Sequence, residues 1–118
     1  MKPDSDRVTR IAELIQTALA SILQAAADRR FQMVTIISVS VTKDLSFARV
    51  YVTMLNEANT KKTIVALNKA AAYFRYELAQ KIELRVMPML KFFYDDSIVR
   101  GSHISSLISE ATKHLPDE

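Results

Sequence analysis

The segment from Ile64 to Ile82 is the feature that most constrains how this chain can fold. Its apolar residues recur every three or four positions, as on one face of an α-helix: Ile64, Leu67, Ala71, Phe74, Leu78 and Ile82. The roughly opposite face carries Lys62, Lys69, Tyr73 and Tyr76. Because the helical pattern runs from about residue 60 to 82, it exceeds the usual helix length. We predict a kink at the small residues in its middle, Ala70, Ala71 and Ala72.

The regions on either side of this segment predict one more long helix and three strands. Residues 5–27 carry a helical apolar stripe: Val8, Ile11, Leu14, Ile15, Ala18, Leu19, Ile22 and Leu23. Residues 32–42 and 47–55 alternate like strands and should form a hairpin around a turn at 43–46. Residues 85–94 read as a third strand, and residues 102–111 as a short last helix.

Two details of the predicted strands are informative. The alternation of the first strand slips between Ile36 and Ile37, which a β-bulge or a strand buried on both faces would explain. In the third strand, Pro88 cannot donate a ladder hydrogen bond, so we expect this strand at a sheet edge or bulged. The order of elements predicts an α+β domain, a three-stranded sheet with helices on one face. Its length of 118 residues suggests a single domain.

The charge is unevenly distributed along the chain. Residues 61–91 hold seven basic and two acidic side chains, whereas residues 92–118 hold two basic and five acidic ones. This uneven distribution of charge suggests that a polyanion binds one face of the protein. The alternative is that these lysines simply lie on a solvated helix surface. We expect no membrane partner, because no apolar run approaches a membrane span and the N-terminus has no signal-peptide core. Without Cys or export signals, a cytoplasmic protein is the default expectation.

Few residues suggest catalysis. The candidates are Asp95, Asp96 and His103, and adjacent aspartates after a strand are more often turn residues. One nearby histidine does not make a metal site, since the only other is His114 in the tail. We therefore expect no enzyme, no cofactor and no metal. The single glycine, Gly101, also excludes glycine-rich phosphate loops.

Several short motifs, in order over about 100 residues, resemble the bacterial ribosome-binding factor A family. They are Arg7-x-x-Arg10, Val39-Ser40-Val41-Thr42-Lys43-Asp44-Leu45, Ala48-Arg49-Val50-Tyr51-Val52, Leu67-x-Lys69-Ala70, Phe74-Arg75, Leu84-Arg85-x-x-Pro88-x-Leu90-x-Phe92-x-x-Asp95 and Gly101. Each motif is weak alone, and their combination is fairly specific. The resemblance implies a KH-like domain of type II topology, αββααβ, spanning residues 1–118 with an ordered core over about 5–108 and a short tail.

In that family an Ala-x-Gly kink replaces the glycine loop of ordinary KH domains. The matching positions are Ala70, Ala71 and Ala72, so this chain departs from the family at Ala72. Alanine favours helix over glycine by roughly 1 kcal/mol, which predicts a milder kink or one maintained by tertiary packing.

The resemblance implies a small-ribosomal-subunit assembly factor. Such a protein binds free or immature small subunits and their rRNA, supports late rRNA processing, and is associated with growth in the cold. Its expected partners are the small subunit and its rRNA, with ribosome-assembly GTPases as further candidates, and a monomer is expected. The alternative is a protein-interaction module that uses a sheet edge or helix face without direct RNA binding.

If RNA is the partner, basic side chains should neutralise its phosphates. The expected contact residues are Arg7, Arg10, Lys62, Lys69, Arg75, Lys81, Arg85 and Lys91. Arg7 and Arg10 join this set through the family match, and by spacing alone they read as solvated residues. Arg75 lies near the edge of the apolar face and could instead pair with a carboxylate. Tyr73 and Tyr76 could stack on bases, or could simply cover the helix surface.

Overall fold

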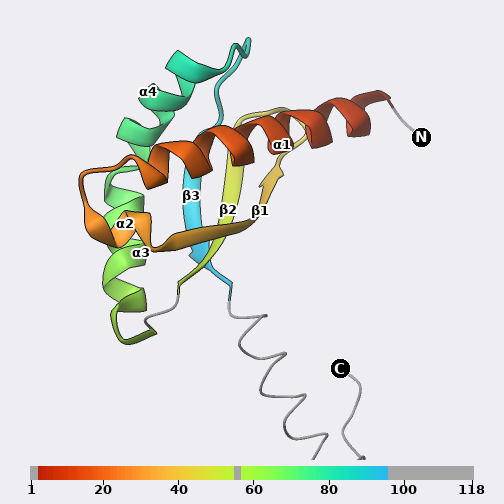
Figure 1. The fold of residues 1–118 in the computed structure, drawn as a ribbon. Helices are drawn as coiled ribbons and strands as arrows, with labels where there is room; N and C mark the ends of the chain where they lie inside the picture. Colours follow the sequence, from red (N-terminus) through yellow and green to blue (C-terminus); the bar gives the residue numbers. More distant parts are fainter. Residues whose placement is uncertain (1–2, 55–56, 96–118) are drawn as a thin grey trace, which may run out of the picture.

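The computed structural model describes residues 3–54 and 57–95. The elements are α1 (Pro3–Gln24), α2 (Arg29–Gln32), β1 (Val34–Val41), β2 (Phe47–Met54), the 3-10 helix η1 (Glu57–Asn59), α3 (Thr60–Lys69), α4 (Ala71–Lys81) and β3 (Met89–Tyr94). The strands form one sheet in the order β1-β2-β3, with α1 crossing one of its faces (Figure 1). This confirms the α+β class and the αββααβ order, to which α2 is an addition. The helix expected at 102–111 lies outside the described residues.

The first two strands form the predicted antiparallel hairpin. Val34 pairs with Met54 at one end and Val41 with Ala48 at the other. The register shifts between Ile36 and Ser38, so Ile37 is an extra residue in β1. Of the two explanations for the slipped alternation, the bulge is therefore the one present, and it keeps apolar residues on both sides of the slip facing the helices.

The third strand is shorter than the sequence predicted. It runs parallel to β2 and begins at Met89, so Arg85 precedes it in a loop. The first ladder bond near this end runs from the Met89 N–H to the Ser46 carbonyl, at 3.0 Å. Pro88 has no N–H to donate, so pairing starts at the residue after it. The edge position predicted for this strand is confirmed.

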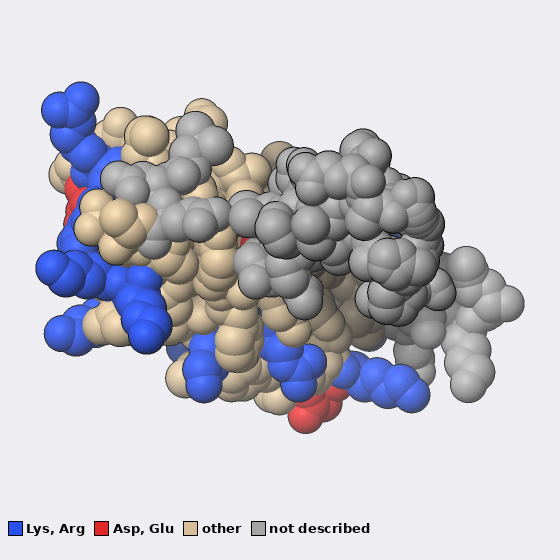
Figure 2. All heavy atoms as spheres, turned by 90° about the horizontal axis from the view of Figure 1, so that it is seen from below, with Lys and Arg blue, Asp and Glu red and all other residues tan. Residues whose placement is uncertain are grey.

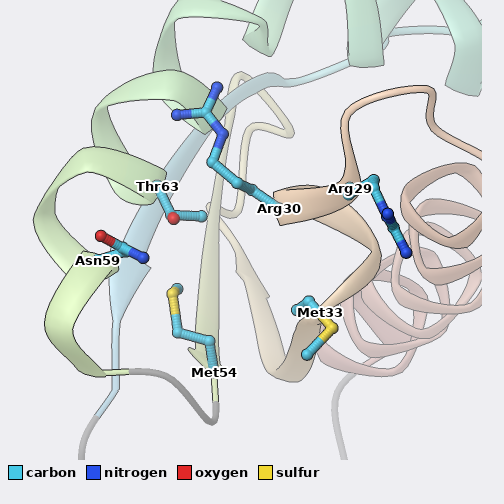
Figure 3. A pocket seen from close by; sticks show the side chains of 6 residues that line it. All are labelled: Arg29, Arg30, Met33, Met54, Asn59 and Thr63. Atoms are coloured by element: carbon cyan, nitrogen blue, oxygen red, sulfur yellow. The ribbon is translucent and has the colours of Figure 1, made fainter.

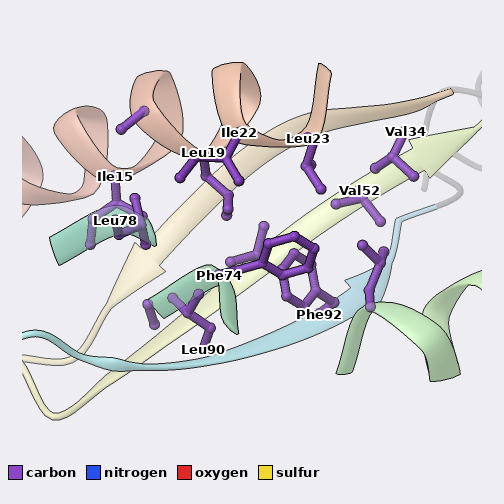
Figure 4. Close-up of a cluster of buried hydrophobic side chains, with 14 of the residues drawn as sticks. Ile15, Leu19, Ile22, Leu23, Val34, Val52, Phe74, Leu78, Leu90 and Phe92 are labelled. Carbon is purple, nitrogen blue, oxygen red and sulfur yellow. The ribbon is translucent and has the colours of Figure 1, made fainter. Parts of the chain in front are cut away.

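The core lies between the helices and the sheet. α1 contributes Ile15, Leu19, Ile22 and Leu23, which lie against the strands in Figure 4. Leu14, predicted in the same stripe, is instead 45% exposed. The apolar stripe of eight residues covers more of the helix surface than the sheet contacts. Residues at the margin of the stripe, such as Leu14, therefore remain exposed to solvent. The helix also ends earlier than predicted, at Gln24, and Asp28 caps the separate helix α2.

Phe74 joins three elements at the centre of this core. Its ring is fully buried, 5.4 Å from the Phe31 ring of α2 and 5.7 Å from the Phe92 ring of β3, both in edge-to-face geometry. Such pairs add about 0.5–1.5 kcal/mol beyond the burial of their area. The core face predicted for 64–82 is thus confirmed, with Leu67, Phe74 and Leu78 buried.

The central helical segment breaks at Ala70, within the predicted alanine run. α3 ends at Lys69 and α4 starts at Ala71, while Ala70 has φ −92° and ψ 6°. None of the three alanines has a positive φ. The Ala70 N–H still bonds to the Ala66 carbonyl at 3.0 Å, so the chain turns with little loss of backbone hydrogen bonding. Ala72 lies inside α4, where a glycine is not needed.

Candidate nucleic-acid interface

The strongest concentration of positive charge lies on α3 and beside it. Lys62 and Lys69 are exposed and seven residues apart, which places them on one face of the helix about 10 Å apart along its axis. Lys61 adds a third exposed cation in the first turn of α3. Figure 2 shows Lys and Arg side chains gathered on the side of the molecule where α2 and α3 lie in Figure 1.

Helix α2 adds two arginines that are not among the contact residues predicted from the sequence. Arg29 and Arg30 are both exposed, and α2 packs against α3. They were missed because residues 28–31 fell between the predicted helix and strand. The signal was present in the run Asp28-Arg29-Arg30, an N-cap residue followed by two cations. We refer to Arg29, Arg30, Lys61, Lys62 and Lys69 as the α2–α3 basic face.

Asp28 fixes one of these arginines. Its carboxylate accepts the Arg30 backbone N–H at 2.9 Å and two guanidinium bonds at 3.1 and 2.7 Å. The side-chain bond to Arg30 lowers the pKa of Asp28 below its ordinary value, and the same bond raises the pKa of Arg30. Arg30 is therefore partly neutralised, whereas Arg29 has no ion pair among the described residues.

A pocket of about 220 Å³ opens between α2 and α3, within this face. Figure 3 shows Arg30 reaching from α2 toward α3, which carries Thr63; Asn59 ends η1 just before this helix. Met33 and Met54 provide apolar lining, and the surface of the pocket is mainly apolar. Flexible methionines with arginines and an amide nearby can accept a flat, partly polar group beside an anion.

The other predicted cations do not join this face. Lys81 ends α4 and Arg85 lies in the loop after it, so both are at the far end of that helix. Lys91 lies in β3, beside Arg49 of β2. Arg7 and Arg10 are exposed in the first turns of α1, about 20 Å along its axis from the end that leads to α2. The predicted residues thus occupy several surfaces.

Arg75 has a structural partner. Its Nε and Nη2 atoms donate to the Met87 carbonyl at 3.1 and 2.8 Å. From the sequence a carboxylate was an alternative partner for Arg75, whereas the observed partner is a backbone oxygen. Through this contact Arg75 ties α4 to the loop that leads into β3. Part of its donor capacity is therefore unavailable to phosphate.

The two tyrosines on α4 are exposed. Tyr73 is 56% and Tyr76 62% accessible, and the Tyr73 ring lies 5.8 Å from that of Phe74. Base stacking by these rings stays a prediction. Of the catalytic candidates, Asp95 follows β3, whereas Asp96, His103 and His114 lie outside the described residues. Within the described part of the chain, no three His, Cys, Asp or Glu residues gather as a metal site would require. None of the described helices could span a membrane.

Comparisons with known proteins agree with the resemblance seen in the sequence. The sequence profile described as ribosome-binding factor A matches residues 7–108. A relative from Nitrosococcus oceani named ribosome-binding factor A is 42% identical over 119 residues, covering 99% of this chain and 94% of the relative. A relative of the same name from Marinomonas sp. is 40% identical, covering 96% and 92%.

Solved structures agree as well. The crystal structure of ribosome-binding factor A from Thermus thermophilus has a TM-score of 0.67 and 29% identity, covering 74% of this chain and 94% of that one. A homology model of the Thermus thermophilus protein, fitted into the cryo-EM map of a 30S–RbfA complex, has a TM-score of 0.63 and 28% identity, covering 75% and 96%. The fold, the kinked central segment and the sequence matches together place this chain in the ribosome-binding factor A family.

Proposed function

We propose that this protein binds free or immature small ribosomal subunits through their rRNA and supports late rRNA processing. The observation that carries the proposal is the likeness to the Thermus thermophilus protein that was fitted into a 30S complex. Exposed cations on α2 and α3 support it, because they suit a phosphate backbone. The proposed activity is binding by a monomer in the cytoplasm, without catalysis.

The proposed mechanism is phosphate neutralisation combined with recognition of RNA shape. The α2–α3 basic face holds five cations, of which Arg30 is paired with Asp28. Folded RNA presents few readable base edges, so shape and phosphate position should determine binding. The kink at Ala70 lies directly after Lys69, and small side chains there allow RNA to approach the helix closely. Since no glycine loop is present, contact would come from side chains.

The test is co-sedimentation of the protein with purified free small subunits at increasing KCl. Binding should weaken steeply with salt. The Lys62→Glu/Lys69→Glu double variant should bind much more weakly at low salt, and the difference from wild type should shrink as the KCl concentration rises. Each lost phosphate contact should reduce the log–log salt slope by about one. Lys81→Glu tests the predicted contact at the end of α4 in the same assay.

Two variants serve as controls. Lys43→Glu makes the same charge reversal at an exposed position in the β1–β2 turn, away from α3, and should have a much smaller effect. Arg75→Gln should reduce the slope less than Lys69→Gln, because Arg75 is already bound to Met87. Binding that ignores salt and both lysine reversals would favour the alternative, a protein-interaction module.

A further inference from the structure

We propose that the sheet face turned away from the helices is a second RNA-binding surface, specific for single-stranded segments. Bases would stack on Tyr51 and Phe93, and phosphates would contact Arg49 and Lys91. This inference relies on the proposed function for the nature of the partner, RNA. It adds a surface made by different residues, on different elements, from those of the α2–α3 basic face.

The strand register creates this surface. Arg49 of β2 is paired with Lys91 of β3, and the next outward pair is Tyr51 with Phe93. Because side chains alternate along a strand, these four point to the face opposite the buried Val50 and Phe92. The two rows are two residues apart, or roughly 6.6 Å along the strands. A row of two cations therefore lies beside a row of two rings.

The rings already form a stacking platform. The Tyr51 and Phe93 centroids are 5.6 Å apart with an interplanar angle of 27°, and both residues are half-buried. Lys91 Nζ lies 5.5 Å from the centroid of Phe93. A cation within reach of an aromatic ring is the arrangement that holds a stacked base and its phosphate together, and stacking tolerates any base.

The charge of this face suits a polyanion. None of the residues of β1, β2 and β3 is acidic, so Arg49 and Lys91 have no carboxylate within the strands. Neither residue forms an ion pair among the described residues. The first carboxylate along β3 is Asp95, which follows the strand. A cation pair without a counter-ion lowers the free energy of a bound phosphate more than a neutralised pair would.

The neighbouring strand leaves room for a ligand. Ser38 is paired with Tyr51, and Ser40 with Arg49, and both serines are exposed. Small hydroxyl side chains beside Tyr51 leave one side of its ring accessible and can bond to sugar or phosphate oxygens. An aromatic pair by itself would stabilise the sheet without any ligand. What points to RNA is the combination of this pair with two cations that have no carboxylate partner within the described part of the chain, and with two small polar neighbours.

The experiment measures binding of the full chain to fluorescein-labelled eight-nucleotide oligoadenylate and oligouridylate by anisotropy. Tyr51→Leu and Phe93→Leu should each weaken binding about fivefold or more, as loss of one stacked base predicts. Arg49→Gln and Lys91→Gln should each lower the salt slope by about 0.7, the value for one phosphate contact to a single strand. Lys43→Gln is the matched control for the two cation variants; it lies in the β1–β2 turn and should leave binding unchanged.

Each possible outcome decides the inference. Circular dichroism establishes that each variant is folded. If Tyr51→Leu or Phe93→Leu unfolds, the test relies on Arg49→Gln and Lys91→Gln, which change exposed side chains. The inference is overturned if these two variants bind the oligonucleotides as tightly as the wild type does. It is also overturned if Lys62→Glu and Lys69→Glu are the only variants that reduce oligonucleotide binding. If small subunits are not bound but the oligonucleotides are bound through these four residues, the proposed function fails and the inference stands.

Discussion

At the scale of single residues, Asp44 organises the turn between β1 and β2. Its Oδ1 accepts bonds from the Thr42 hydroxyl at 2.8 Å, the Ser46 hydroxyl at 2.8 Å and the Ser46 N–H at 3.1 Å. The next residue, Leu45, has φ 62°, a conformation that normally disfavours a side chain with Cβ. The carboxylate bonds and the packing of Leu45 against the core hold the turn in this conformation.

The Asp44 bonds predict a pH dependence of stability. The hydrogen bonds from Ser46 lower the pKa of Asp44, so its contribution is present above the ordinary value of 3.8 and is lost as pH falls through the lower folded pKa. Asp44→Ala should therefore lower the Tm at pH 7, and the difference from wild type should shrink below about pH 3.8. Thermal melts between pH 7 and 2 measure this. Glu83→Ala is the control, and a difference that does not change with pH would contradict the prediction.

At the scale of elements, the break between α3 and α4 does not depend on glycine. Ala70 adopts a negative φ, and Ala72 lies in the first turn of α4. Leu67 and Phe74 are both fully buried on either side of the break. Packing of these two side chains into one core therefore sets the angle between the helices, because neither can leave without creating a cavity.

Replacing Ala72 with glycine should destabilise the protein. Glycine offers no conformational benefit at a helical position and adds entropy to the unfolded chain, so Ala72→Gly should cost about 0.5–1 kcal/mol. Urea unfolding measures the difference, with Ala79→Gly at a likewise exposed position in the last turn of α4 as a comparison. Greater stability of the Ala72→Gly variant would mean that the break is strained.

Asn68 connects α3 to the free edge of β3. Its Nδ2 donates to the Phe92 carbonyl at 3.1 Å, and its Oδ1 accepts the Phe92 N–H at 2.8 Å. The amide thus pairs with the strand as a neighbouring strand would, and it covers backbone groups that would otherwise be open to another chain.

Asn68→Ala should therefore be strongly destabilising. It would leave the Phe92 N–H and carbonyl without partners in a half-buried position, at a cost of about 2 kcal/mol. Urea unfolding checks this value. Gln80→Ala removes an amide from an exposed position on α4 and should change stability by less than about 0.5 kcal/mol. Similar losses in the two variants would show that the bonds to Phe92 contribute little.

At the scale of the whole molecule, positive charge is divided among separate surfaces. The α2–α3 basic face lies at one end. Lys81 is the last residue of α4, and Arg85 lies in the loop after it. Arg49 and Lys91 lie on the sheet. α4 is 11 residues long, so about 16 Å separates Lys69 from Lys81 along its axis. A large, folded RNA surface suits this division better than a short ligand does.

This separation predicts independent effects of distant cations. The losses of subunit-binding free energy in Lys69→Glu and Lys81→Glu should add to within about 0.5 kcal/mol in the double variant, since the two sites share no partner. Affinities at one fixed KCl concentration for the four proteins form the double-mutant cycle. A large coupling would mean that one phosphate group contacts both lysines.

The sequence by itself determined the local structure. Apolar periodicity identified α1, the central segment and the hairpin, and the slip at Ile36 and Ile37 indicated the bulge. These features are visible in the sequence because burial of one face of a helix or strand spaces its apolar residues regularly. The run of charges between 61 and 91 identified the helical segment as basic. The family motifs indicated the family to which the chain belongs. These properties are readable because each depends on residues close together in the sequence.

Only the tertiary structure decided which residues meet. It brought Arg29 and Arg30 beside α3, committed Arg75 to the Met87 carbonyl, and placed Lys91 beside Arg49 and the two stacked rings. It also placed β3 next to β2, an order that the crossover through α3 and α4 left open. Contacts between distant segments depend on how the helices pack over the sheet, and periodicity within one segment carries no information about that packing.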